Sequence, residues 1–477
     1  MSRESPLCLF LILLPVISPI GLASAQQREI DFAELDRVAL AELQETKTPG
    51  AAMAVISGDR VIFAKGLGEA NVETGVPVTV DALFHIGSVT KMFTAAALVI
   101  LSEEGKIKLD APIGNYVKGL SPKLAQITAH QLLSQTSGLK DVPGDYGLHE
   151  ETALGDFVRS LKDEDLLIDK GQAFSYSNVG FALAGYVIEQ ASGKPYADQM
   201  NESLFKPLGM RRTTLRPTEA ITYPLVTGHT AQGQAAPTVV RPLADDTRLW
   251  PAGYIFTTLQ DLWRFVIAVM NGGKLEGRQI LPPAVSARLL SPNVDIPTNV
   301  FVNGKYAYGF FAHDYYGMRM FEHGGLLPGY SSEVRLLPEQ RIGVIILNNK
   351  DGVRLNKTFA KAFELMLPSF KVPAAAAQPK SPLTISEREM TRYAGTYVNR
   401  WPIEILVRDD KLFFKQGGAE LPVTKIGESR FCVTPLGAPQ AQEFLIVSAA
   451  DGKPAYLQMF LWIFKRVEPR NKSVATR

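Results

Sequence analysis

Cysteine is almost absent from this sequence, and its scarcity excludes two kinds of site. Among 477 residues there are two cysteines, Cys8 and Cys432, and Cys8 falls in an N-terminal stretch that we expect to be removed. The one remaining cysteine can build neither an internal disulfide nor a cysteine metal cluster. Histidine is also scarce, and His149-Glu-Glu lacks the second histidine of a zinc-binding helix. The sequence therefore predicts no metal and no other cofactor.

An excess of charge of either sign is missing too. The formal net charge is +2, with 21% charged and 46% hydrophobic residues and no basic cluster. This balance is typical of a globular protein and gives no support to nucleic-acid binding. Gly66-Leu-Gly68 lacks the third glycine of a dinucleotide loop. No Gly-x-Ser-x-Gly elbow occurs, which argues against an α/β-hydrolase.

A long apolar run does occur at the N-terminus. It extends from Leu7 to Ile20, follows Arg3 and precedes Ala23-Ser-Ala25. A positive residue, an apolar core and a small-x-small site predict a signal peptide over residues 1–25 and a periplasmic or secreted protein. The alternative is an uncleaved membrane anchor, but two prolines interrupt the run. We therefore expect no stable membrane anchor after cleavage.

The length predicts more than one domain. A small-residue stretch punctuated by proline, Pro373 to Pro382, indicates a linker over residues 371–384. We expect the first domain to cover residues 26–370, with predicted helices over 30–46 and 355–367 and predicted strands over 51–55, 60–65, 306–311, 318–321, 330–337 and 342–347. Residues 385–470 contain many short alternating runs with turn signals between them, which predict a separate all-β barrel.

One stretch carries a nucleophile pattern, Ser88-Val-Thr-Lys91, at the start of an apolar helix that we expect to end at Gly105. Residues three apart on a helix share one face, so the hydroxyl and the amine can meet. A serine needs a neighbouring base, and a lysine becomes one only when burial lowers its pKa. The apolar neighbours of Lys91 supply that condition.

Ser-x-x-Lys alone is a weak signal. It recurs at Ser137–Lys140 and at Ser203–Lys206, where glycine or proline follows closely and no sustained helix begins. The alternative for Ser88 is a capping serine with a solvated lysine one turn later.

Two further segments supply the other parts of such a site. Tyr176-Ser-Asn178 lies in a polar turn that opens a helix, and His323-Gly324-Gly325-Leu326 follows a predicted strand. Paired glycines permit a ligand to approach the strand backbone closely. The alternatives are a core tyrosine and a packing histidine, and a second Tyr-x-Asn pattern in the C-terminal part shows that this motif is common.

Together these three segments resemble the motifs of the serine β-lactamase and penicillin-binding protein superfamily. The resemblance spans about residues 30 to 367 and is closest to class C β-lactamases, family VIII esterases and D-aminopeptidase-like hydrolases. It implies an α+β fold, with a central antiparallel sheet flanked by helices. The C-terminal module is similar to the lipocalin-like domains that some of these hydrolases carry, a less specific likeness.

The resemblance also implies roles for the site residues. Ser88 is expected to be acylated, and Lys91 and Tyr176 to share the work of the general base; which of them is the base stays open. The backbone amides of Ser88 and Leu326 are expected to form the oxyanion hole, with Gly325 allowing the approach. Asn178 is expected to bind the acyl side of the substrate.

The third motif departs from that family pattern. Lactamases and transpeptidases usually have lysine first and a hydroxyl residue second, whereas this chain has His323 and Gly324. A histidine is mostly neutral above about pH 6.5, so it holds a substrate carboxylate less well than an ammonium group. The sequence therefore predicts an exported serine hydrolase that prefers small-molecule esters. A D-amino-acid peptidase, a β-lactam-hydrolysing enzyme or a non-catalytic binder are the alternatives, and the oligomeric state is open.

Overall fold

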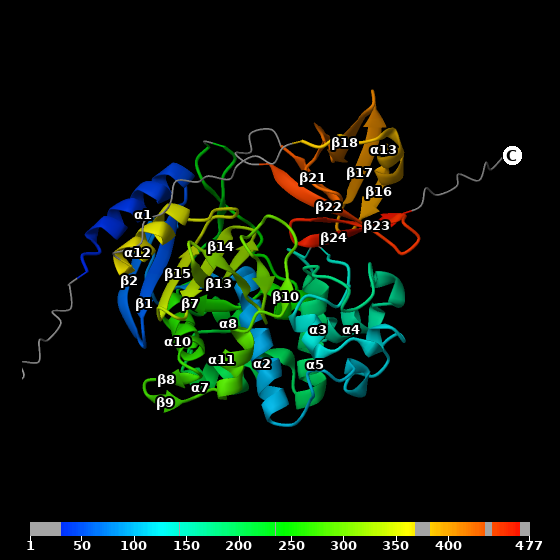
Figure 1. Cartoon of the computed structure of the whole chain (residues 1–477). Helices are drawn as coiled ribbons and strands as arrows, with labels where there is room; N and C mark the ends of the chain where they lie inside the picture. Colours follow the sequence, from blue (N-terminus) through cyan, green and yellow to red (C-terminus); the bar gives the residue numbers. More distant parts are fainter. Residues whose placement is uncertain (1–29, 143, 234, 368–381, 435–440, 468–477) are drawn as a thin grey trace, which may run out of the picture.

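Two nine-stranded antiparallel sheets form the frame of the molecule, one in the larger N-terminal part and one in a C-terminal barrel (Figure 1). The computed structural model describes residues 30–142, 144–233, 235–367, 382–434 and 441–467. The predicted signal peptide and most of the predicted linker lie outside the described residues, so both stay predictions, as do the proposed domain boundaries.

The first sheet joins the two ends of the N-terminal part. Its strand order is β10-β11-β12-β13-β14-β15-β1-β2-β3, so an early hairpin pairs with a late meander through β1 and β15. The bounds are β1 Gly50–Ser57, β2 Arg60–Asn71, β3 Val76–Pro77, β10 Val294–Asp295, β11 Lys305–Tyr306, β12 Phe311–Tyr315, β13 Met318–Leu327, β14 Tyr330–Leu337 and β15 Ile342–Asn348.

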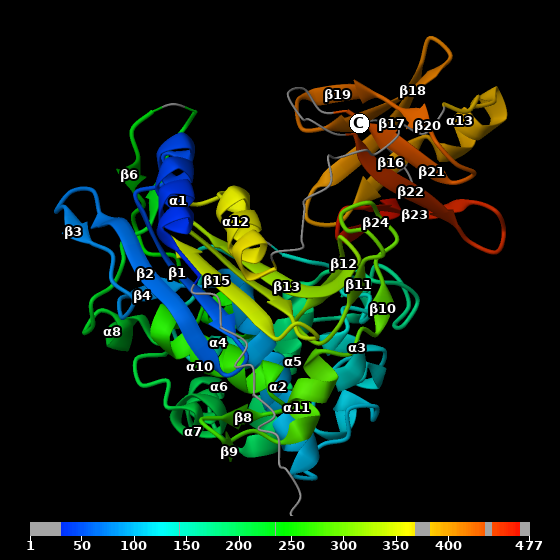
Figure 2. The same ribbon diagram turned by 60° about the vertical axis from the view of Figure 1, so that its left-hand side comes forward.

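Helices cover both faces of this sheet, which is why its central strands are buried and rich in Ala, Val and Ile. Helices α1 (Ala33–Thr46) and α12 (Asn356–Met366) lie side by side on one face, as Figure 2 shows. The other face packs on a larger helical layer that includes α2 (Thr90–Glu103), α5 (Asn178–Ser192) and α10 (Leu259–Met270).

Shorter elements complete this layer. They are β4 Leu83–His85 paired with β7 Phe256–Thr258, β5 His229–Thr230 with β6 Thr238–Val239, β8 Lys274–Leu275 with β9 Arg278–Gln279, and helices α3 Ala129–Leu133, α4 Ala153–Ser160, α6 Tyr196–Met200, α7 Lys206–Leu208, α8 Pro217–Ala220, α9 Trp250–Gly253 and α11 Pro283–Leu289. Among the described residues, no helix has the length and apolar character that a bilayer crossing requires.

Two predictions about the strands near the site are wrong. The strand predicted over residues 306–311 is mostly a turn: Tyr306 ends β11 and Phe311 begins β12, and between them Gly309 has a φ of +75° and packs its backbone on Met92. The strand predicted over residues 318–321 continues to Leu327, because β14 offers partners along its whole length. The His323-Gly324-Gly325 segment therefore lies within a strand instead of following one.

The barrel is formed by nine strands in the order β19-β18-β17-β16-β24-β23-β22-β21-β20. Its two edge strands are separated by Val423 alone, so one bent segment pairs at both ends of the sheet and nearly closes it. The bounds are β16 Gly395–Val398, β17 Pro402–Arg408, β18 Lys411–Gln416, β19 Ala419–Pro422, β20 Thr424–Lys425, β21 Arg430–Val433, β22 Gln442–Ser448, β23 Pro454–Met459 and β24 Trp462–Val467.

The barrel also holds a helix that the sequence pattern did not suggest, α13 (Glu387–Tyr393), which begins with a capping box between Ser386 and Glu389. The nine strands and their own apolar core confirm the predicted barrel, to which α13 is a short addition. Its likeness to lipocalin-like domains stays a prediction.

Candidate active site

Ser88 lies in a short 3-10 turn, Gly87–Val89, that runs directly into α2. The hydroxyl is half-buried, whereas Lys91 on the first turn of α2 is fully buried. Lys91 Nζ lies 3.1 Å from Ser88 Oγ. The expected meeting of hydroxyl and amine is therefore present, and the alternative of a solvated lysine does not apply.

The Lys91 amine has fixed neighbours besides Ser88. It lies 2.7 Å from Asn178 Oδ1 and 2.7 Å from the carbonyl oxygen of Ala252, and 4.7 Å from the centre of the Tyr176 ring. Burial lowers the pKa of Lys91 to about 7; the Arg400 charge adds to this effect and the Asp141 charge opposes it. A substantial fraction of the amine is therefore neutral near pH 7.

Tyr176 is buried beside this amine. Burial raises its pKa well above the ordinary value for a phenol, and a side-chain hydrogen bond with Ser88 opposes that shift. Its backbone N–H donates to the carbonyl of Leu461 at 2.8 Å, a contact from the barrel. The phenol therefore stays protonated over the range in which Lys91 loses its proton.

Asn178 is the first residue of α5, and the hydroxyl of Ser177 caps this helix by accepting from the Gly180 N–H at 3.1 Å. The backbone N–H of Asn178 donates to Asp141 Oδ1 at 2.8 Å, and the side-chain nitrogen of Asn178 lies 3.4 Å from Asp141 Oδ2. The amide therefore presents its oxygen to Lys91.

His323 lies buried among aromatic rings, with ring centroids 5.0 Å from Phe311 and 6.2 Å from Tyr176. Its Nδ1 lies 2.7 Å from the carbonyl oxygen of Gly324. Burial, together with the Lys91 charge, lowers its pKa to about 3. The imidazole is therefore neutral at every pH at which the protein is expected to work.

Close backbone packing joins β13 to the turn that carries Ser88. A Cβ on Gly325 would fall 1.9 Å from the carbonyl oxygen of Ile86, and one on Gly87 would fall 2.5 Å from the nitrogen of Leu326. Gly87 also has a φ of +51°, which favours glycine. The two amides expected to form the oxyanion hole thus belong to neighbouring backbone segments, while the Leu326 side chain is 60% exposed at the rim.

All seven residues predicted for the site come together; six of them line one cavity, and the fully buried Lys91 contacts Ser88 and Asn178 without lining it. The cavity has a volume of about 1010 Å³, and its lining includes Ser88, Tyr176, Asn178, His323, Gly325 and Leu326. In the other two Ser-x-x-Lys tetrads the side chains have other partners: Lys140 pairs with Asp165, and the Ser203 hydroxyl donates to the Gln199 carbonyl.

Several residues of the site are not apparent from the sequence. Asp141 directly follows the Ser137–Lys140 tetrad, and Arg354 precedes α12; neither belongs to a motif. Arg400 and Trp462 lie in the barrel and line the same cavity. Within the described ranges, no group of three His, Cys, Asp or Glu residues could hold a metal ion.

A buried amine against a serine, a protonated phenol and two adjacent backbone amides define a serine acyl-transfer site. The model of the Beta-lactamase family matches residues 35–365. The chain therefore belongs to this family.

Relatives and solved structures agree with that placement. The chain is 29% identical to penicillin-binding protein 4 of Amycolatopsis lactamdurans over 74% of its own length and 94% of the relative. It is 27% identical to protein flp of Staphylococcus aureus (strain MW2), where the match covers 66% of this chain and 62% of the relative.

The folds of three solved structures also match. SurE has a TM-score of 0.75 at 22% identity, covering 91% of this chain and 98% of that one. The octameric penicillin-binding protein homologue from Pyrococcus abyssi has a TM-score of 0.65 at 24% identity over 91% and 99%. EstCE1, described as a hydrolase with promiscuous acyltransferase activity, has a TM-score of 0.59 at 21% identity over 69% and 97%. These likenesses show the shared fold.

Proposed function

We propose that the chain hydrolyses small carboxylic esters through an acyl-enzyme on Ser88, with Lys91 as the general base. The observation that carries this proposal is the set of neighbours around the Lys91 amine. A neutral amine has two N–H hydrogens and one lone pair. Asn178 Oδ1 and the Ala252 carbonyl are both acceptors at 2.7 Å, so they take the two hydrogens. The lone pair is left for the Ser88 hydroxyl.

The first half-reaction follows from these positions. Ser88 Oγ attacks the ester carbonyl while its proton passes to Lys91, and the backbone amides of Ser88 and Leu326 stabilise the oxyanion. The phenol of Tyr176, which shares a hydrogen bond with Ser88, donates its proton to the leaving oxygen as the ester bond breaks. The Lys91 ammonium then returns the serine's proton to the phenolate, so both groups regain their starting forms. Water then attacks the acyl-enzyme in the same way, releasing the acid and restoring the serine.

The preference for esters rests on His323. The family pattern has a lysine at this place, whose charge can hold a substrate carboxylate, but the imidazole here is buried and neutral. A neutral ring among aromatic side chains favours a substrate without a carboxylate at that point.

A second candidate, a D-amino-acid peptidase or β-lactam-hydrolysing enzyme, is favoured by a different observation. The guanidinium of Arg354 lies beside Gly324, 3.4 Å from where a Cβ would stand, and its side chain is 60% exposed in the cavity lining. This cation stands next to the position at which relatives carry a hydroxyl residue. It offers an alternative anchor for a carboxylate.

The test is a substrate panel with the full-length protein: p-nitrophenyl esters, D-amino-acid amides and nitrocefin, each with wild type and Ser88→Ala. We expect ester turnover to exceed the others and to require Ser88, and a fluorophosphonate to add one label at Ser88 by intact mass. Nitrocefin or amide turnover well above ester turnover, lost in Arg354→Gln, would favour the second candidate. No Ser88-dependent adduct with any acylating probe would favour a non-catalytic binder.

We also propose that the protein is exported and acts in the periplasm or outside the cell. The N-terminal pattern at residues 1–25 supports this proposal. N-terminal sequencing of the protein recovered from its native cells tests it: a start at Gln26 in the exported fraction is expected, and an intact N-terminus in the cell membrane would contradict it.

A further inference from the structure

The barrel contacts the backbone of the second motif directly. In the turn between β23 and β24, the carbonyl of Leu461 accepts from the Tyr176 N–H at 2.8 Å. The Ile463 N–H donates to Ser175 Oγ at 3.2 Å, and Gln458 Nε2 donates to the Phe174 carbonyl at 2.9 Å. Three consecutive residues that lead to Asn178 are therefore held by one hairpin of the barrel.

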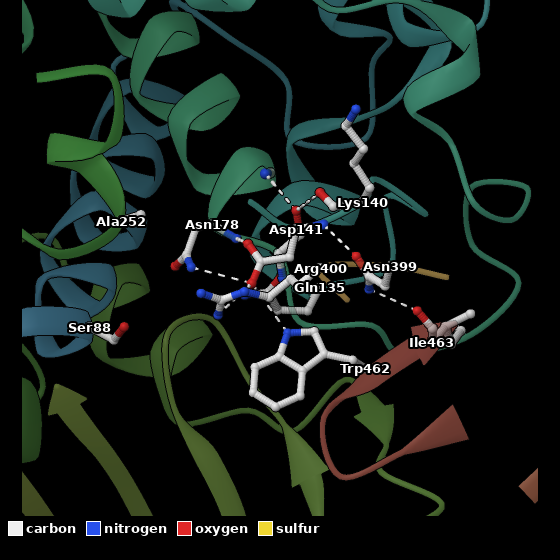
Figure 3. A network of polar contacts seen from close by, with 12 residues as sticks. Ser88, Gln135, Lys140, Asp141, Asn178, Ala252, Asn399, Arg400, Trp462 and Ile463 are labelled. Carbon is white, nitrogen blue, oxygen red and sulfur yellow. Dashed lines mark hydrogen bonds and ion pairs between the residues drawn. The ribbon is translucent and has the colours of Figure 1, made fainter. Parts of the chain in front are cut away.

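A buried carboxylate lies at the centre of this contact, as Figure 3 shows. Asp141 Oδ2 is 3.3 Å from Arg400 and 3.2 Å from Trp462 Nε1, and the Asp141 N–H donates to Asn399 Oδ1 at 3.0 Å. The same carboxylate accepts from Asn178 through its other oxygen. The Asp141 side chain has no exposed surface, so these hydrogen-bond donors offset the free-energy cost of removing its charge from water.

We propose that Arg400 and Trp462 of the barrel are positioning residues of the hydrolase site. By binding the Asp141 carboxylate they hold Asn178 against Lys91 and keep that carboxylate from stabilising an ammonium group at Lys91. The barrel thus sets the protonation of the catalytic base, and the site is incomplete without it. This inference rests on the role proposed for Lys91.

The charges around Lys91 explain the direction of the effect. The titratable groups that face it are Asp141, Tyr176 and His323, with Arg400 behind Asp141; the phenol and the imidazole are both neutral. With Arg400 present, Asp141 is already paired, and a proton on Lys91 leaves a net positive charge in a buried cluster. Without Arg400, the same proton balances Asp141. Removing the guanidinium therefore favours the ammonium form of Lys91.

Arg400 is itself held in place. Its guanidinium carbon lies 5.6 Å from the centre of the Trp401 ring and 5.9 Å from the centre of the Trp462 ring, and its side chain is about one quarter exposed. Trp462 also stands edge-on to the Tyr176 ring at 6.3 Å. A rigid, always-charged group is therefore presented to Asp141 at the edge of the cavity.

The test measures the second-order rate of Ser88 labelling by a fluorophosphonate from pH 5 to pH 10, using full-length protein. We expect Arg400→Gln to move the acid limb to higher pH by about one unit, so that the rate at pH 7 falls several-fold and recovers near pH 10. Asp141→Asn is expected to move the limb to lower pH, and the double variant to return it close to wild type. Arg408→Gln, which removes an exposed arginine of the same barrel paired with Glu420, is the matched control.

Opposite shifts for the two single variants distinguish this role from simple loss of structure. A uniform fall in rate at every pH, or a double variant that keeps the limb of Arg400→Gln, would overturn the proposal. If Arg400→Gln does not fold, the acid limb of Asp141→Asn alone tests the proposal. A limb that moves to higher pH or does not move would contradict an electrostatic effect of Asp141 on Lys91. Wild-type protein without any Ser88 label would instead overturn the proposed function.

Discussion

The carbonyl oxygen of Ile86 occupies the space that a side chain at residue 325 would need. A Cβ on Gly325 would lie 1.9 Å from that oxygen and 2.4 Å from Ser332 Oγ, whereas one on the neighbouring Gly324 would meet the Arg354 guanidinium at 3.4 Å. The Ser332 hydroxyl also donates to the Ile86 carbonyl at 2.6 Å. Strand β13 and the turn of Ser88 are therefore fitted to each other without spare room.

This contact predicts different outcomes for two adjacent glycines. Gly325→Ala is expected to push β13 from the Ser88 turn, lowering the free energy of unfolding by about 1–3 kcal/mol and the rate of Ser88 acylation at least tenfold. Gly324→Ala, on the same strand, is expected to change both much less. Thermal unfolding and fluorophosphonate labelling of the two variants provide the comparison, and equal behaviour would contradict the close packing.

The lowered pKa of Lys91 predicts the pH dependence of acylation. The amine is neutral above about pH 7 and protonated below it, so the rate is expected to rise with pH through this value and to level off above it. Because the pKa of Tyr176 is raised, its ionisation adds no alkaline limb below about pH 10. Labelling rates in constant-ionic-strength buffers measure this; a limb centred near pH 4 or pH 10 would argue against Lys91 as the base.

The neutrality of His323 gives a separate prediction. Since its pKa is about 3, it does not titrate between pH 5 and pH 9. His323→Gln is therefore expected to leave the position of the acid limb unchanged. The rate is expected to fall by the same factor at every pH, because the ring contacts with Phe311 and Tyr306 are lost. An acid limb that disappears in this variant would make the histidine, not Lys91, the titrating group.

A buried carboxylate far from the site predicts a stability effect. Glu42 on α1 accepts from the Lys357 N–H at 2.9 Å, the Thr358 N–H at 2.8 Å and the Thr358 hydroxyl at 2.7 Å, at the start of α12. Glu42→Gln removes the charge from this helix N-terminus and is expected to lower the free energy of unfolding by about 1–3 kcal/mol. Glu45→Gln, which breaks an exposed pair with Lys357, is expected to cost at most about 0.5 kcal/mol. Denaturant unfolding of both variants makes the comparison.

The sequence was most informative where chemistry and local periodicity coincide. Ser88 and Lys91 are close in sequence, so helical spacing alone was enough to expect their contact, and the capped helix behind Asn178 carried its own signals. Strand β14 was predicted with its observed bounds because the turn residues Gly329 and Pro338 stand directly before and after it. These features depend on interactions within a few residues.

What the sequence could not reveal depends on distant partners. The turn at Gly309 exists because its backbone packs on Met92, and β13 extends past its predicted end because β14 runs beside it. Arg400 lies 259 residues from Asp141, so no local pattern connects them. Burial of Lys91 and a lowered pKa were expected from its apolar neighbours, but the opposing effects of Asp141 and Arg400 on that pKa come from residues far away in the chain.

The hairpin turn at Phe460 and Leu461 constrains how such chains can diversify. Both of its carbonyls are engaged by the other part of the molecule, Phe460 by the Thr298 hydroxyl and Leu461 by the Tyr176 N–H. A barrel borrowed from another protein would work here only with a turn of the same length and shape at that place. Natural variation should therefore tolerate inserted residues at the exposed turn Asp409–Asp410 and reject them at residues 460–461.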